Sequence, residues 1–188
     1  MTMPAPFPFP VLETERLILR EWQDDDAEAL FRSFGREEVL KYIPIEKHQD
    51  AERSLQTIQR FRKRFHELQS GLVWAIQRKD TGEVIGETGI NEWMPDHFRI
   101  TIGYSFNPDH WGHGFATEAV GRNVKFAFEE FPLFKVNRIE ALTDPANIGS
   151  IKVLEKLGFK KEAHIRQGEF QKGEFVDSLM FAKLRSDR

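Results

Sequence analysis

A short segment with two glycines has the composition of a phosphate-binding turn. It covers residues 111–117, WGHGFAT, and stands between a predicted strand and a predicted helix. The first turn of a helix has unpaired backbone N–H groups and carries the positive end of the helix dipole. Glycine lets a phosphate approach these groups with no Cβ in the way. The segment therefore predicts a seat for a diphosphate; a tight turn without a ligand is the alternative.

Two other phosphate-binding motifs fit this segment less well. A P-loop requires Gly-x-x-x-x-Gly-Lys-Ser/Thr, which the sequence does not contain. A dinucleotide-binding fingerprint requires a third glycine or an alanine where Thr117 stands. That fingerprint also opens the first strand–helix–strand unit, whereas several predicted strands precede this turn. The sequence therefore disfavours a nicotinamide-dependent oxidoreductase.

Two histidines and an aspartate lie at the start of the same turn. Asp109, His110 and His113 are metal-ligand types, but a glycine turn is a poor rigid scaffold and no further ligand has suitable spacing. We therefore expect no metal, and we interpret the histidines as surface side chains near a phosphate.

Hydrophobic periodicity predicts the elements that carry the turn. Alternation of apolar and polar residues predicts strands at residues 16–22, 72–78, 84–93, 98–106, 138–143, 160–170 and 175–184. Apolar residues at helical spacing, with capping residues and terminal glycines, predict helices at residues 24–34, 50–70, 112–131 and 147–157.

The order of these elements indicates a mixed sheet. Short turns join the strands between residues 72 and 106, which makes them an antiparallel meander. The strand–helix–strand unit at residues 98–143 makes its two strands parallel if they are neighbours. We therefore predict an α/β (α+β) fold, with a mostly antiparallel sheet of about seven strands, one parallel pair and about four helices. A ligand crevice is expected at the parallel pair, where the helix begins.

Composition limits the class of protein. The chain has 188 residues, 40% of them hydrophobic, which suffices for one domain with its own core. We expect an extended proline-rich lead-in at residues 1–11 and a single domain at residues 12–188. A net charge of −3 disfavours a general nucleic-acid binder. The lack of cysteine excludes disulfides and suits the cytoplasm, and no apolar run approaches the roughly 20 residues that span a membrane.

Five short motifs appear in a fixed order along the chain. They are TERLILR at 14–20, IGY at 102–104, WGHGFATEA at 111–119, NIGS at 147–150 and LEKLGF at 154–159. Together they resemble the Gcn5-related N-acetyltransferase (GNAT) superfamily, and most closely its RimJ/RimL-like branch of ribosomal-protein N-acetyltransferases. The resemblance spans about residues 12–184, so the domain at 12–188 resembles an N-acetyltransferase domain.

The resemblance implies the acyl-CoA N-acyltransferase fold and acetyl-CoA as co-substrate. Gly114 and Ala116 match the family's pyrophosphate loop, whereas Trp111 stands where the wider family has glutamine or arginine. It also implies that the parallel strands splay and that the pantetheine arm lies in the gap, paired with the strand edge. The implied cofactor-binding residues are Ser105, Phe106, Asn107, Trp111, Gly112, His113, Gly114, Phe115, Ala116, Thr117 and Asn147.

The resemblance also implies the catalytic residues. Ser150 would be the acid toward the leaving thiolate, and Asn147 would hold the pantetheine or a water. Local sequence offers helix capping as the alternative for both. Glu169, in the stretch QGEF, would be the general base, with an exposed hairpin glutamate as the alternative. Asp177 is interpreted as structural. Many family members use a tyrosine acid, but no tyrosine lies near residue 150 in the sequence.

The implied function is transfer of acetyl from acetyl-CoA to a primary amine by direct attack in a ternary complex. The acceptor could be a protein N-terminal α-amine. A non-catalytic acyl-CoA-binding sensor on the same fold is the alternative. We expect an amine acceptor as partner, no nucleic acid, no membrane, and a monomer or homodimer.

Overall fold

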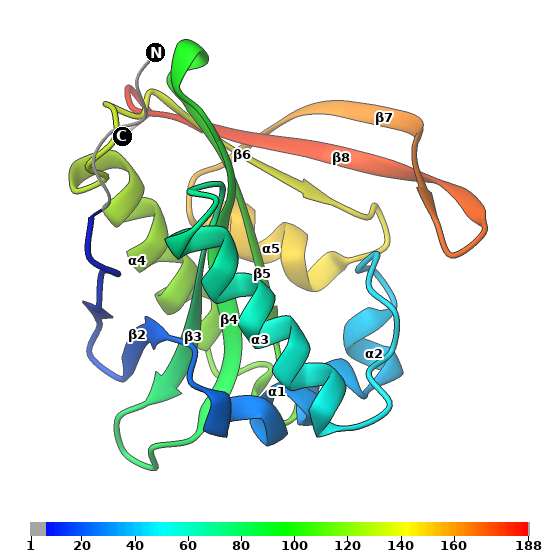
Figure 1. Cartoon of the computed structure of the whole chain (residues 1–188). Coiled ribbons are helices and arrows are strands. Elements are labelled where there is room, and N and C mark those ends of the chain that lie inside the picture. The colour runs from blue at the N-terminus through cyan, green and yellow to red at the C-terminus, as the bar shows by residue number, and fades with distance from the viewer. Residues whose placement is uncertain (1–6, 188) are drawn as a thin grey trace.

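A computed structural model describes residues 7–187 and contains one central sheet with helices on both faces (Figure 1). Within these residues the sheet has eight strands in the order β1-β2-β3-β4-β5-β6-β8-β7. The strands are β1 Leu12–Glu13, β2 Leu17–Glu21, β3 Leu72–Arg78, β4 Val84–Met94, β5 Arg99–Phe106, β6 Arg138–Thr143, β7 Lys160–Gln171 and β8 Glu174–Leu184.

The described residues form five α-helices and three short 3-10 helices. The α-helices are α1 Ala27–Phe34, α2 Glu37–Leu40, α3 Ala51–His66, α4 Phe115–Glu129 and α5 Ile148–Lys156. The 3-10 helices are η1 Asp24–Asp26, η2 Pro95–His97 and η3 Pro108–His110. The predicted mixed α/β fold is confirmed, and β3 and β6 have the bounds that periodicity predicts.

The parallel pair lies where the sequence predicts it. Strands β5 and β6 pair in parallel only from Arg99 to Thr101 on β5 and from Arg138 to Glu140 on β6. β5 then continues to Phe106 with β4 as its partner, while β6 pairs with β8 along its whole length. The two strands therefore separate after Thr101, which leaves one edge of β5 unpaired.

The structure differs from the sequence prediction in several local features. Strand β1 and helix α2 were not predicted because elements of two and four residues leave no periodic pattern. The predicted strand at 98–106 begins one residue later, because Phe98 is the C-cap of η2 with a left-handed φ of 49° and is 53% exposed. The first predicted helix begins at Ala27, because residues from Asp24 form η1.

Alternate residues of β3 join two separate parts of the core. Trp74 and Ile76 pack in the cluster that contains α4, and the Trp74 ring meets Phe126 at 5.4 Å between centroids. Val73 and Ala75 pack in the cluster that contains α1 and part of α3. Because successive strand residues point to opposite faces, α4 covers one face of the sheet and α1 covers the other.

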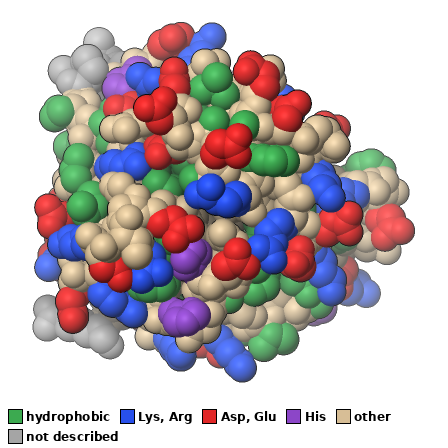
Figure 2. Space-filling model, turned by 90° about the horizontal axis from the view of Figure 1, so that it is seen from below, with side chains coloured by type: hydrophobic (Ala, Val, Ile, Leu, Met, Phe, Trp, Pro, Cys, Tyr) green, Lys and Arg blue, Asp and Glu red, His purple; other side chains and the backbone are tan. Residues whose placement is uncertain are grey.

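The end of the proline-rich lead-in packs on the core. The rings of Phe7 and Phe9 lie 5.2 Å and 5.0 Å from the ring of Phe65, and Trp74 Nε1 donates a 2.7 Å hydrogen bond to the carbonyl of Pro10. The rest of the predicted lead-in, residues 1–6, lies outside the described residues. Among the described helices, none combines the length and apolar character required to cross a bilayer. The surface in Figure 2 intersperses acidic and basic side chains.

Candidate active site

The glycine turn joins β5 to α4 with its backbone amides free. Gly112 and Gly114 have φ values of 78° and 82°, in the left-handed region that favours glycine. Gly114 is the N-cap of α4 and has no side chain to cap the helix. Within the described residues, the N–H groups of residues 112–117 donate no hydrogen bond. These amides and the helix dipole make the turn suited to bind an anion.

The surface over the turn leaves room for a ligand. Among the described residues, a Cβ added at Gly112 would meet no atom within 4 Å, and one at Gly114 would approach only Arg16 Nη2, at 3.5 Å. Arg16 and Arg78 lie over the ring of Phe115, with guanidinium-to-centroid distances of 4.4 Å and 5.4 Å. Both guanidinium groups are paired with carboxylates, Arg16 with Glu118 and Arg78 with Asp80, so the fit of this turn to a diphosphate rests on its free amides.

A carboxylate in the first turn of α4 holds the turn against the chain before β2. Glu118 Oε1 accepts hydrogen bonds from Thr14 Oγ1 at 2.6 Å and from the Arg16 N–H at 2.9 Å. Arg16 Nε donates to Glu118 Oε2 at 2.7 Å, and Arg16 Nη1 donates to the His113 carbonyl at 3.1 Å. Burial raises the pKa of Glu118, but these hydrogen bonds outweigh it and the pKa is lowered. The TERLILR motif at 14–20 and the WGHGFATEA motif at 111–119 are thus in contact through Glu118.

The unpaired edge of β5 presents its backbone on alternate residues. The Asn107 N–H donates to the Ile85 carbonyl on β4, and Ser105 is aligned with Glu87 in the same register. Because paired residues of an antiparallel ladder alternate, Tyr104 and Phe106 direct their backbone groups to the gap. The Phe106 carbonyl accepts a 2.8 Å hydrogen bond from Trp111 Nε1. The Phe106 N–H and the Tyr104 backbone thus face the opening.

Ser150 and Asn147 lie at the start of α5. Asn147 is the N-cap, and its Oδ1 accepts a 3.1 Å hydrogen bond from the Ser150 N–H, so its capping role is present in the structure. The Ser150 hydroxyl lies 2.9 Å from the hydroxyl of Tyr104. A tyrosine therefore does reach Ser150, although 46 residues separate the two in the sequence. Sequence reasoning missed Tyr104 as a neighbour of Ser150 because β5 and α5 come together only in the folded chain.

Glu169 lies in the β7–β8 hairpin and has its hydrogen-bond partners there. Its Oε1 accepts a 3.0 Å hydrogen bond from Ser178 Oγ, and its Oε2 accepts one from Gln171 Nε2 at 2.5 Å. In residues 7–187, no hydrogen bond joins Glu169 to Ser150. Asp177 accepts from the Gln167 N–H at 2.9 Å and contacts His164 Nε2 at 2.7 Å. These two bonds lower its pKa and fit a structural role.

A second carboxyl group, Glu87 of β4, was missed by sequence reasoning. Its Oε1 accepts a 3.2 Å hydrogen bond from Ser105 Oγ on β5, on the sheet face that α1 covers. Burial raises the pKa of Glu87 to about 7, and the hydrogen bond from Ser105 only partly opposes this. A group with this pKa beside the open strand can exchange a proton near neutral pH. The sequence signal that could have indicated Glu87 is a charged residue in the middle of the strand predicted at residues 84–93.

The histidines at the turn have separate neighbours. His110 Nε2 lies 3.4 Å from Glu83, and Asp109 binds Arg36 at 2.7 Å. The ring of His113 stacks on Phe115 at 6.1 Å between centroids. No group of three or more potential metal ligands forms in the part of the chain that the structure describes.

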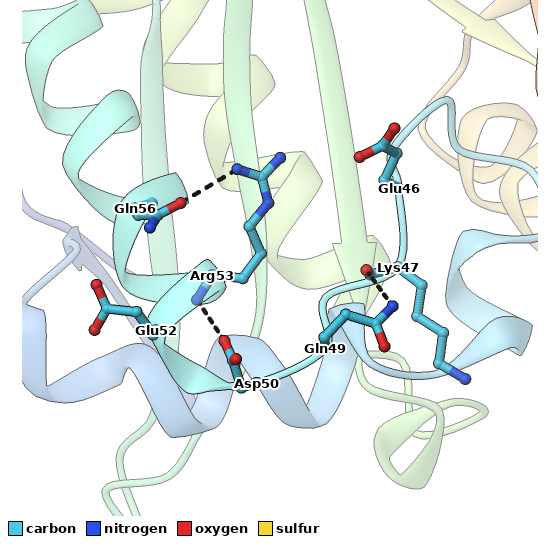
Figure 3. A pocket seen from close by; sticks show the side chains of 7 residues that line it. All are labelled: Glu46, Lys47, Gln49, Asp50, Glu52, Arg53 and Gln56. Atoms are coloured by element: carbon cyan, nitrogen blue, oxygen red, sulfur yellow. Dashed lines mark hydrogen bonds between the residues drawn. The ribbon is translucent and has the colours of Figure 1, made fainter.

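An open polar depression of about 470 Å³ lies at the N-terminus of α3 (Figure 3). The residues that line it are Glu46, Lys47, Gln49, Asp50, Glu52, Arg53 and Gln56. Asp50 caps α3 there by accepting the Arg53 N–H at 2.8 Å, and Arg53 also binds Gln56. None of these residues belongs to the predicted cofactor or catalytic set, so this depression is separate from the candidate site.

The splayed parallel pair, with free amides at the start of the following helix, defines the class of acyl-CoA N-acyltransferase folds. The sequence profile of the acetyltransferase (GNAT) domain matches residues 16–160. The chain belongs to this GNAT family of acetyltransferases.

Individual relatives agree with this assignment. The Bacillus subtilis (strain 168) protein called uncharacterized N-acetyltransferase YoaA is 38% identical over 174 residues, which cover 93% of this chain and 96% of that protein. A GNAT-family acetyltransferase structure from Bacillus anthracis has a TM-score of 0.81 at 26% identity, covering 93% of this chain and 98% of the other. The structure of RimL, a ribosomal L7/L12 alpha-N-protein acetyltransferase in complex with coenzyme A, has a TM-score of 0.81 at 17% identity. The match covers 95% of this chain and 100% of the RimL chain.

Proposed function

We propose that the chain transfers the acetyl group of acetyl-CoA to a primary amine, by direct attack of the amine in a ternary complex. The observation that carries this proposal is the row of free amides at residues 112–117 beside the unpaired edge of β5. A diphosphate on these amides would lie within reach of a pantetheine arm along β5. An extended ligand can satisfy such an edge through backbone hydrogen bonds.

We assign cofactor contacts to the residues of the turn and of the β5 edge. The N–H groups of residues 112–117 would bind the pyrophosphate, and the Phe106 N–H would pair with the pantetheine. Ser105 and Asn107 would support this edge from the β4 side, and Trp111 would hold the Phe106 carbonyl. Asn147 would retain its capping bond while its remaining amide group faces the cofactor.

The catalytic roles follow from the chemistry of amide formation. A thioester supplies an acyl group that a neutral amine can attack directly. Glu169 would accept the proton that the amine loses, through a water, and Ser150 would donate a proton to the departing thiolate. Glu87 is a second candidate for the base because its pKa lies near neutrality.

We place the acceptor between the β7–β8 hairpin and α2. Lys172 Nζ, in the hairpin turn, donates a hydrogen bond to the Leu40 carbonyl at the end of α2. Arg36, just before α2, binds Asp109 after β5. Both contacts hold α2 near Glu169 and the end of β5. A protein N-terminal α-amine is our preferred acceptor, and the fold shared with RimL supports it.

An acceptor screen tests this function. The full chain would be incubated with acetyl-CoA and with peptides of varied N-termini, polyamines or aminoglycosides, and the released thiol would be measured. Transfer to a peptide N-terminus supports the preferred acceptor. Tight acetyl-CoA binding without thiol release in any mixture would instead indicate an acyl-CoA sensor. Absence of binding would refute the assignment of residues 112–117.

A further inference from the structure

The hydroxyl of Tyr104 makes a contact that crosses the gap in the sheet. It lies 2.9 Å from Ser150 Oγ and 3.2 Å from the Ser150 carbonyl oxygen. Tyr104 belongs to the part of β5 that has lost its β6 partner, whereas Ser150 belongs to α5, the helix after β6. The two sides of the opening are therefore joined through the residue that we assign as the acid.

The contact can control where the Ser150 proton points. A carbonyl oxygen only accepts, so two proton arrangements satisfy the geometry. In one, Tyr104 donates to the Ser150 carbonyl, and the Ser150 hydroxyl donates to the Tyr104 oxygen. In the other, Tyr104 donates to Ser150 Oγ, and the Ser150 proton is free to point into the gap. Asn147 Oδ1 is already bound by the Ser150 N–H.

We propose that Tyr104 is a positioning residue for Ser150: its hydroxyl donates to Ser150 Oγ and thereby directs the Ser150 proton toward the sulfur of coenzyme A. This inference rests on the proposed function, because it requires the sulfur to lie in the gap beside α5. Tyr104 itself transfers no proton and does not touch the sulfur.

The surroundings of Tyr104 fit a permanent hydrogen-bond donor. Burial raises its pKa to about 12. The hydroxyl therefore keeps its proton throughout the neutral range. A donor at fixed position also binds Oγ more strongly as negative charge develops there.

A single conservative substitution isolates the hydroxyl. Tyr104→Phe keeps the ring, which packs against the main core cluster, and removes only the oxygen that contacts Ser150. The matched control is Tyr42→Phe, the same chemical change at the chain's other tyrosine, which lies between α2 and α3. Thermal unfolding of both variants checks that the fold is retained.

The test compares coenzyme A with desulfo-coenzyme A, which lacks the sulfur. Calorimetry at about pH 9, above the pKa of roughly 8.5 of an ordinary thiol, measures how much the protein prefers the thiolate. We expect Tyr104→Phe and Ser150→Ala each to reduce this preference by about five- to tenfold, the effect of losing one hydrogen bond. Desulfo-coenzyme A affinity should stay within about twofold, and the double variant should resemble either single variant.

The outcomes separate this inference from the function on which it rests. A Tyr104→Phe preference equal to that of the wild type, or an effect that adds to that of Ser150→Ala, would overturn the positioning role while acetyl transfer persists. A wild type that binds both ligands equally would also overturn it. A wild type that binds neither ligand and releases no thiol would refute the proposed function itself. In turnover, kcat should fall in Tyr104→Phe with the KM for acetyl-CoA unchanged.

Discussion

Glu118 in the first turn of α4 binds Arg16 through both of its carboxylate oxygens. Oε1 accepts the Arg16 backbone N–H at 2.9 Å, and Oε2 accepts Nε at 2.7 Å. Arg16 Nη1 also donates a hydrogen bond to the His113 carbonyl. The segment before β2 therefore supports the turn that we assign to the pyrophosphate. The Glu118 side chain is 19% exposed, which shields these bonds partly from solvent.

Replacement of this carboxylate should loosen the turn. We expect Glu118→Gln to lower the free energy of unfolding by about 1–2 kcal/mol, since it weakens charged hydrogen bonds of a partly exposed pair. Acetyl-CoA should also bind more weakly. The pKa of Glu118 is lowered from 4.5, so its stabilising contribution is present above that pH and is lost as pH falls. Urea unfolding at several pH values measures this loss.

The control for this substitution lies on the same helix. Glu129→Gln removes an equal charge where the side chain is 61% exposed and, within residues 7–187, contacts only the Lys125 ammonium, at 3.9 Å. It should change stability by less than about 0.5 kcal/mol. Equal effects of the two substitutions would contradict the role of Glu118.

A side chain at Gly114 should damage the anion seat. Gly114→Val strains the left-handed backbone at φ 82° and places methyl groups beside the free amides. We expect the dissociation constant for acetyl-CoA to rise at least about tenfold, because each lost tenfold corresponds to about 1.4 kcal/mol of binding free energy. Calorimetric titration with acetyl-CoA measures it.

Gly173 supplies a control with the same backbone strain. It lies in the β7–β8 turn at φ 89°, and an added Cβ would meet no described residue within 4 Å. Gly173→Val should cost similar stability and leave acetyl-CoA affinity unchanged. If both valine variants bind acetyl-CoA like the wild type, residues 112–117 are not the pyrophosphate-binding site.

Removal of the Glu169 charge should affect the chemical step. Glu169→Gln keeps a group that can bind Ser178 and Gln171, but it cannot accept a proton. We expect kcat near neutral pH to fall by about 10²–10⁴-fold, the usual contribution of a general base, with little change in acetyl-CoA affinity. Steady-state assays of thiol release measure both quantities.

Glu174 of the same hairpin is the matched control, since it is exposed and pairs across the strands with Gln171. Glu174→Gln should retain full turnover. Full turnover in Glu169→Gln, combined with loss of turnover in Glu87→Gln, would transfer the role of base to Glu87.

Glu87 should make stability depend on pH. Its folded-state pKa of about 7 lies above the ordinary 4.5, so the folded protein holds this proton more tightly than the unfolded chain. The contribution of Glu87 to the free energy of unfolding is therefore fully present below its ordinary pKa of 4.5 and is lost as pH rises toward 7. The loss is on the order of 3 kcal/mol, from 1.36 kcal/mol per pKa unit. Glu87→Gln should remove it in urea unfolding measured from about pH 5 to pH 8.

The comparison is with Glu92→Gln, an exposed position on the same strand. That variant should follow the wild-type pH profile. A Glu87→Gln profile that also follows the wild type would show that Glu87 is ionised throughout this range in the folded protein.

Much of this protein could be predicted because the determining signals are local. Alternation along residues 72–78 and 138–143 defines β3 and β6, and two glycines before an apolar helix pattern define the start of α4. The strand–helix–strand order then makes the two strands a parallel pair if they are neighbours. Strand periodicity and glycine backbone preference act between near neighbours, so one sequence contains them.

The contacts inside the site were decided by tertiary structure. Tyr104 reaches Ser150 only because β6 leaves β5 after Thr101 and α5 then returns across the gap. The raised pKa of Glu87 depends on desolvation in the folded chain, and the hydrogen bonds between Glu118 and Arg16 join residues 102 positions apart. Burial and hydrogen bonding between distant residues depend on packing geometry, which no local pattern encodes. The sequence by itself thus determined most of the helices and strands and the glycine turn before α4, and the folded chain decided which side chains lie in contact.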